Sequence, residues 1–151
     1  MIKVYPLICG LTIALIAENS AATSINTSIT VYKSPYCGCC SAWIKHLERH
    51  GFSVITHDTE NLQVYKQQAN LPYGLGSCHT AFVDQYAIEG HVPAQDIQKM
   101  LSEKPDFRGL AVPGMPAGSP GMDFSDKKER YQTLGYTIQG QTDVYKIHGI
   151  N

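Results

Sequence analysis

Three thiols fall within four residues at Cys37-Gly38-Cys39-Cys40, and this cluster is the part of the sequence best suited to chemistry. Thiols this close together bind a soft metal or take part in thiol–disulfide exchange. A bond between the neighbours Cys39 and Cys40 would force a strained ring. A Cys37–Cys40 disulfide is geometrically easy, but it closes too small a loop to stabilise a fold much. We therefore interpret the cluster as a functional site, and the alternative is a Cys37–Cys40 disulfide that leaves Cys39 free.

The third thiol separates two hypotheses for this site. Thioredoxin-type exchange needs one attacking and one resolving thiol, which Cys37 and Cys40 supply without Cys39. Crowded thiolates favour Cu(I), and three of them on one turn can bridge several ions. The residues therefore favour binding of more than one Cu(I) ion, and a thiol–disulfide oxidoreductase that uses Cys37 and Cys40 is the second hypothesis.

Three further sulfur atoms are candidate ligands. Cys78 begins a predicted strand, and Met115 and Met122 each follow a Pro-Gly pair. A thioether is neutral, so it can complete a Cu(I) site without adding charge to several thiolates. The segment 109–122 is apolar and rich in Gly and Pro, and we predict that it is an ordered loop that folds back over the cluster and brings Met115 or Met122 to it. The alternative is that these three side chains only pack.

The histidines give weaker signals. His46 and His50 have the spacing of two zinc ligands on a helix, but no third ligand follows the pattern, so we expect both to face solvent. His79 adjoins Cys78 and is a candidate ligand, although alternation along a strand would point it away from its neighbour. The remaining histidines are expected in loops or at the surface: His57, His91 and His148.

Helices and strands that must position these residues alternate along the chain. The patterns predict strands at 28–32, 52–57, 78–84 and 86–89, a late strand at 143–148, and helices from Cys39 or Cys40 to His50, at 60–70 and at 93–103. The order β-α-β-α-β-β-α implies an α/β fold with a sheet packed by helices. With a cysteine pair at the first strand-to-helix turn, it resembles the thioredoxin fold. Thioredoxins carry a cis-proline before the third strand, where this chain has Ser77-Cys78-His79-Thr80.

Residues 1–22 are predicted to be a signal peptide. Lys3 precedes an apolar run from Val4 to Ala17, and small residues at 20–22 suit cleavage near Ala22. The run is too short for a membrane span. Cys9 has a faint lipid-attachment context, and we interpret it as part of the removed signal. The chain is therefore expected to be exported and soluble.

The rest of the chain has the size of one domain. We assign residues 27–151 to a single thioredoxin-like metal-binding domain that includes a Gly/Pro-rich extension at 105–151. Lys and Arg number 12 against 13 Asp and Glu, and they form no basic block. This near-neutral charge argues against nucleic acid as a partner.

Four segments together resemble one known family. They are Cys37-Gly38-Cys39-Cys40 with Trp43, the segment 77–81, the segment 89–94, and the Gly/Pro-rich segment 109–122. In this combination the chain resembles the CopG family of exported copper-resistance proteins. The resemblance implies a periplasmic, thioredoxin-like domain that binds copper as a thiolate-bridged cluster and handles copper redox states. It also implies copper ions and other periplasmic copper-handling proteins as partners, with Cys37, Cys39, Cys40 and Cys78 as ligands and Met115 and Met122 as further ones.

Overall fold

The computed structural model describes residues 27–124 and 126–149. The predicted signal peptide at 1–22 and Cys9 lie outside the described residues. Within them the chain forms a mixed α/β fold of seven strands and three helices. In chain order these are β1 (Ser28–Lys33), α1 (Gly38–Arg49), β2 (Ser53–Asp58), α2 (Leu62–Gln68), β3 (His79–Val83), β4 (Tyr86–Gly90), α3 (Ala94–Glu103), β5 (Gly109–Val112), β6 (Tyr131–Tyr136) and β7 (Thr142–His148).

The strands form one sheet in the order β2-β1-β3-β4-β5-β6-β7. β1 runs parallel to β2 and β4 runs parallel to β5, while the other neighbours are antiparallel. The predicted order of elements holds through α3. The start of the cysteine-bearing helix and the start of β3 therefore lie side by side, because β3 pairs directly with β1.

The segment after α3 differs from the prediction. Residues 109–112 are not loop but strand β5, and β6 was not predicted at all. Gly109 allows β5 to lie against β4, since a Cβ there would collide with the carbonyl of Ala87. The late strand is observed as β7. Strands of the extension thus continue the same sheet.

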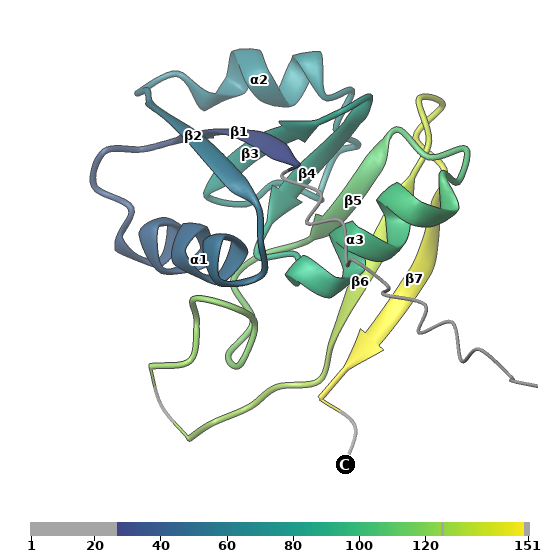
Figure 1. Ribbon diagram of the computed structural model, residues 1–151. Coiled ribbons are helices and arrows are strands. Elements are labelled where there is room, and N and C mark those ends of the chain that lie inside the picture. Colours follow the sequence, from purple (N-terminus) through teal and green to yellow (C-terminus); the bar gives the residue numbers. More distant parts are fainter. Residues whose placement is uncertain (1–26, 125, 150–151) are drawn as a thin grey trace, which may run out of the picture.

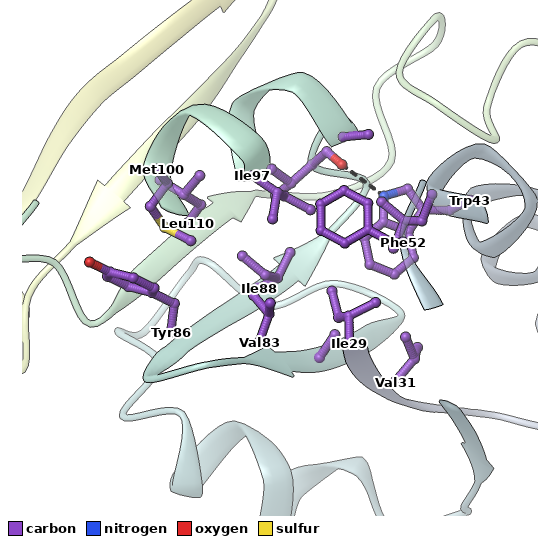
Figure 2. Close-up of a cluster of buried hydrophobic side chains, with 14 of the residues drawn as sticks. Ile29, Val31, Trp43, Phe52, Val83, Tyr86, Ile88, Ile97, Met100 and Leu110 are labelled. Atoms are coloured by element: carbon purple, nitrogen blue, oxygen red, sulfur yellow. Dashed lines mark hydrogen bonds between the residues drawn. The ribbon is translucent and has the colours of Figure 1, made fainter. Parts of the chain in front are cut away.

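Apolar side chains cover both faces of the sheet. One cluster packs α1 and α3 on one face and includes Ile29, Trp43, Ile88 and Ile97, as Figure 2 shows. A smaller cluster around Ala69 packs α2 on the other face, consistent with the opposite positions of α1 and α2 in Figure 1. The helices are therefore fixed to opposite faces of the sheet by burial of apolar surface.

Helix α1 has a defined beginning and end. Cys37 occupies its N-cap position. At its other end, Gly51 adopts φ +88° and donates a hydrogen bond to Glu48 O at 3.0 Å, while Phe52 N donates to Leu47 O at 3.2 Å. This pair of bonds is a Schellman motif, for which glycine is the favoured residue. The helix axis and the direction of the cysteine turn are thereby fixed.

Two histidines at the end of α1, His46 and His50, contact α3, so the prediction that both face solvent was wrong. Both are half-buried, and their rings lie 4.3 Å apart. His46 Nε2 accepts a hydrogen bond from Ala94 N at 3.1 Å, at the start of α3. His50 Nε2 lies 3.0 Å from Gln95 Nε2. His46 therefore acts as a cap for α3, because its ring nitrogen satisfies an amide that has no partner within its own helix.

His148 was also expected at the surface, and it is half-buried instead. Its Nε2 lies 2.8 Å from Asp96 Oδ2, and the same carboxylate oxygen accepts a hydrogen bond from Thr133 Oγ1 at 2.6 Å. These bonds tie β6 and β7 to the first turn of α3. His57 is exposed on β2, as predicted.

No helix within residues 27–124 and 126–149 combines the length and the apolar character needed to cross a lipid bilayer.

Trp43→Phe is expected to destabilise the protein by about 2–4 kcal/mol. Trp43 is fully buried, and its Nε1 donates to Val92 O at 2.8 Å, so phenylalanine would leave this carbonyl unpaired and a void beside it. Urea unfolding of the metal-free protein measures the change. Tyr36→Phe, at a side chain that is 89% exposed, is the control and should change stability by less than about 0.5 kcal/mol. Equal stability of Trp43→Phe and the wild type would contradict this account of the core.

His46→Gln is expected to flatten the pH dependence of stability between about pH 6.5 and pH 4. Burial, followed by the charges of His50 and Arg49, lowers the pKa of His46 from 6.5 to about 4. Below pH 6.5 the unfolded chain therefore binds a proton that the folded chain does not, so stability is lost as the pH falls. Because the ring is half-exposed, we expect a contribution of only about 1 kcal/mol.

Glutamine can still accept from the Ala94 amide but does not titrate. Urea unfolding at pH 7 and pH 4.5 compares the two proteins, with the exposed substitution Ser102→Gln as the control. An identical loss of stability in His46→Gln and the wild type would show that His46 is not responsible.

Candidate functional site

Four cysteine sulfurs meet where the start of α1 lies against the start of β3. The sulfur of Cys37 accepts a hydrogen bond from the Cys40 amide at 3.3 Å. Cys78 directly precedes β3 and reaches the same place because β3 pairs with β1, the strand that leads into Cys37. The sulfurs of Cys37, Cys39, Cys40 and Cys78 all lie within 4.8 Å of one another. The structure thus brings together all four cysteines that the sequence singles out.

Cys37 and Cys40 form a disulfide, which is the alternative that the sequence left open, while Cys39 and Cys78 are free thiols. Cys39 Sγ lies 3.4 Å from Cys37 Sγ and 4.0 Å from Cys78 Sγ. Cys40 is fully buried, and its Sγ lies 3.7 Å from the carbonyl oxygen of Cys78. Binding of one metal centre by all four sulfurs therefore requires the bridge to be reduced, because the thiolate is the metal ligand.

A buried carboxylate holds the segment that carries Cys78. Glu89 on β4 is fully buried, and its Oε1 accepts a hydrogen bond from Ser77 N at 2.6 Å. Its Oε2 accepts from Thr80 Oγ1 at 2.7 Å, and Lys66 of α2 forms an ion pair with it. The carboxylate is thus paired and fully hydrogen-bonded, as a buried charge must be. Cys78, between Ser77 and β3, is positioned by this network.

The Gly/Pro-rich segment after β5 folds back over the cysteines, as the sequence predicts. Ser77 Oγ donates a hydrogen bond to Gly114 O at 2.7 Å, which ties this segment to the Cys78 segment. The next residue, Met115, places its Sδ 4.0 Å from Cys39 Sγ. Met115 is half-exposed, so its thioether lies at the solvent side of the cysteine cluster.

A second contact, at Gly121, holds the segment against α1. In Figure 1 the segment passes below this helix. Gly121 has φ +84°, and a Cβ there would lie 2.7 Å from Trp43 N and 2.8 Å from Cys39 O. Only glycine permits this approach. Met122 N donates to Ser119 O at 2.8 Å within the same turn. Among the described residues, Met122 shows no sulfur contact with the cysteines comparable to that of Met115.

His91 is part of the site: it lies in a loop, which is one of the two predicted alternatives, but it is not at the surface. It is fully buried in the connection between β4 and α3. Its Nε2 lies 3.3 Å from Cys78 Sγ, and its Nδ1 lies 2.7 Å from the carbonyl oxygen of Pro120. Because a carbonyl only accepts, Nδ1 carries the proton in this bond, and Nε2 presents its lone pair to the thiol. A second group of possible metal ligands is therefore Cys78, His79 and His91.

His79 also faces Cys78, contrary to the argument from strand alternation. Its Nδ1 lies 3.5 Å from Cys78 Sγ. The alternation rule does not apply, because Cys78 precedes the first residue of β3 and is not in strand geometry. The ring is fully buried 4.3 Å from the Trp43 ring, and its Nε2 has no hydrogen-bond partner among the described residues.

Burial governs the protonation of these groups. It raises the pKa of Cys78 to about 11, with the Ser77 hydrogen bond acting in the opposite direction. Burial also lowers the pKa of His91, against the hydrogen bond to Pro120, and holds that of His79 well below its usual value. At neutral pH the site therefore presents a protonated Cys78 and two neutral imidazoles. Neutral imidazole is the form that binds metals.

The spacing and type of these atoms fit a soft metal. Two thiolates on one ion at about 2.3 Å and tetrahedral angles lie about 3.8 Å apart. The Cys37–Cys39 and Cys39–Cys78 sulfur separations, 3.4 and 4.0 Å, bracket this value. Thiolate and imidazole are ligands of copper and zinc, and thioether is a ligand of Cu(I), whereas Mg²⁺ and Ca²⁺ prefer oxygen.

Three residues of the site escaped the sequence analysis as functional groups: Ser77, Glu89 and His91. Each lies beside a motif that was noted, but its role depends on contacts with distant segments. A signal that could have identified them is that all three lie in segments 77–81 and 89–94, two of the four segments that carry the family resemblance.

Two solved structures and one family model match this chain. Solved structures of two forms of a protein named copper resistance protein CopG share 46% sequence identity with this chain, and each match covers 82% of this chain and 98% of the other at a TM-score of 0.77. A family model described as a protein of unknown function, DUF411, matches residues 75–122, the segment that contains Cys78, His91 and Met115. No curated protein matches the sequence.

Proposed function

The chain belongs to the CopG family of copper resistance proteins, and from this premise we propose that it binds Cu(I) through its cysteine thiolates and cycles copper between oxidation states. The observation that carries the proposal is the convergence of four cysteine sulfurs within 4.8 Å. Thiolates at this spacing can bridge ions, which supports the binding of more than one Cu(I) ion.

Met115, His79 and His91 support copper over zinc. A thioether is a good ligand for Cu(I) and a poor one for zinc, and Met115 Sδ lies 4.0 Å from Cys39 Sγ. The two neutral imidazoles add nitrogen atoms beside Cys78. Nitrogen ligands suit Cu(II) better than thioethers do, so this mixed set can accommodate both oxidation states. We include Met122 as a further candidate ligand, since it follows directly on the turn that contacts α1.

The disulfide state links copper binding to redox chemistry. Oxidation of Cys37 and Cys40 to the disulfide removes two of the four thiolates, which lowers the number of ligands available to Cu(I). Reduction restores them. We propose that the protein works in this way after export to the periplasm, with other copper-handling proteins there as donors or acceptors of the ions.

We further propose that residues 27–151 form one thioredoxin-like domain. The support is the order β2-β1-β3-β4 with parallel β1 and β2, together with a cysteine pair at the first strand-to-helix turn. The Cys37–Cys40 disulfide at the start of α1 also favours a second candidate function, thiol–disulfide exchange with partner proteins. In that case Cys37 would be the attacking thiol.

Anaerobic titration of the reduced protein tests the main proposal. We expect the wild type to bind more than one Cu(I) ion and to prefer it over Zn(II), as element analysis and competition with a Cu(I) chelator would measure. Cys39→Ser should lower the copper content sharply, because Cys39 lies between the other sulfurs. The exchange function needs only Cys37 and Cys40, so an unchanged copper content in Cys39→Ser, with full disulfide reductase activity, would favour the second candidate.

Met115→Leu should weaken Cu(I) binding roughly tenfold, a loss of about 1.4 kcal/mol. Leucine preserves the volume of the side chain but removes the thioether that lies 4.0 Å from Cys39 Sγ. Met122→Leu is the matched substitution on the same segment, and we expect a smaller effect because no comparable sulfur contact positions it. Chelator competition measures both affinities. Wild-type affinity in a Met115→Leu, Met122→Leu double variant would exclude both thioethers as ligands.

A further inference from the structure

Two free thiols lie in line with the disulfide. Cys39 Sγ is 3.4 Å from Cys37 Sγ, which is one half of the bridge, and 4.0 Å from Cys78 Sγ on its other side. A disulfide bond is about 2.05 Å long, so side-chain rotations that bring the sulfurs about 1.5–2 Å closer would allow either pair to bond. When no metal is bound, the same sulfurs are close enough to undergo thiol–disulfide exchange with one another.

We propose that Cys39 and Cys78 form a second disulfide, which exchanges with the Cys37–Cys40 disulfide inside the metal-free protein. The cluster is then an internal disulfide relay in addition to a metal site. This activity depends only on the positions of the sulfurs and does not rest on copper binding.

The first step is attack by the Cys39 thiolate on Cys37 Sγ. The bond between Cys39 and Cys37 forms as the bond between Cys37 and Cys40 breaks, and Cys40 leaves as a thiolate that takes up the proton released by Cys39. The attacking sulfur already lies within van der Waals distance of its target. The number of disulfides is unchanged.

The second step is attack by Cys78 on Cys39 Sγ. The two sulfurs lie 4.0 Å apart, and Cys78 releases its proton as it attacks. The bond between Cys78 and Cys39 forms, and the bond between Cys39 and Cys37 breaks. Cys37 leaves as a thiolate and takes up the proton that Cys78 releases.

The start of α1 favours Cys37 as the leaving group. Its sulfur occupies the N-cap position and already accepts a hydrogen bond from Cys40 N at 3.3 Å. Negative charge at a helix N-terminus is stabilised by the amides there. The net reaction converts one disulfide and two thiols into the other disulfide and two thiols, so no external oxidant or reductant is consumed.

The relay gives the buried sulfur of Cys40 a route to solvent. Cys40 is fully buried, whereas Cys37, Cys39 and Cys78 are each half-buried. Exchange moves the disulfide from a pair that contains the buried sulfur to the pair Cys39 and Cys78, either of which a dithiol from solution can attack.

Formation of the second disulfide is tested in a Cys37→Ser, Cys40→Ser double variant that is stripped of metal by chelation. One equivalent of diamide should convert Cys39 and Cys78 into an intramolecular disulfide, seen as the loss of two hydrogen atoms by mass spectrometry and as a linked peptide pair after digestion. Cys37→Ser, Cys39→Ser, Cys40→Ser is the control and has no partner for Cys78. Two free thiols after treatment of a folded, monomeric double variant would overturn the proposal.

Exchange is tested in the wild type, which removes any doubt about the fold of a variant. The metal-free protein with one disulfide per chain is alkylated slowly under native conditions, and the labelled cysteines are identified by peptide mapping. Exchange predicts label on all four cysteines at a rate independent of protein concentration. Label confined to Cys39 and Cys78 would overturn it.

Single variants resolve the two steps. In Cys39→Ser the relay is broken, so only Cys78 should be labelled. In Cys78→Ser the first step remains, so label should appear on Cys39 and Cys40. Because all these measurements are made without metal, failure of the relay and failure of copper binding would be recognised separately.

Discussion

A single buried carboxylate supports the arrangement of the site. Glu89 binds the amide of Ser77, the hydroxyl of Thr80 and the ammonium group of Lys66. Removing one partner from such a buried pair typically costs about 3–5 kcal/mol, because a charge is left without compensation. The Ser77 hydroxyl in turn binds the segment that carries Met115 through Gly114 O. The positions of Cys78 and of the thioether therefore both follow from where Glu89 places the backbone before β3.

The two chemistries proposed for the four sulfurs compete. A disulfide between Cys37 and Cys40 withdraws two thiolates from any metal, and a bound metal withdraws them from oxidation. The histidines beside Cys78 are compatible with both, since a neutral imidazole binds a metal and also accepts a proton from a thiol. Metal occupancy and the oxidation state of the cysteines are thus linked, because both depend on the same sulfurs.

Local sequence patterns were sufficient for the first part of the fold and for the cysteines. The apolar spacing of Cys40, Trp43 and Leu47 identified α1, and the thiols of the first turn needed no tertiary information. His91 could not be placed in this way. It belongs to a short connection, and whether such a residue is buried depends on which distant segment covers it, in this case the turn at Pro120.

Two strands of the extension, β5 and β6, were missed for different reasons. β5 has only four residues, begins with Gly109 and is followed by Pro113, so its apolar run was too short to distinguish from an ordered loop. β6 alternates weakly, since Thr133 is buried for its bond to Asp96 and not for its hydrophobicity. The Met115 contact was anticipated because an apolar, uncharged segment of this length needs a surface to pack on.

The segment that carries Met115 is anchored at both ends in the sheet, by Val112 at the end of β5 and by Tyr131 at the start of β6. Between these anchors, Gly114 accepts a hydrogen bond from Ser77, and Gly121 lies against Cys39 and Trp43 of α1. A ligand bound by both the cysteine turn and this segment would therefore stabilise the two strands that hold the segment. Its binding would slow the hydrogen exchange of backbone amides in β6 and β7, although these strands do not touch it. The strands β5 to β7 would then contribute to the site through their stability, because a bound ion would oppose their local unfolding.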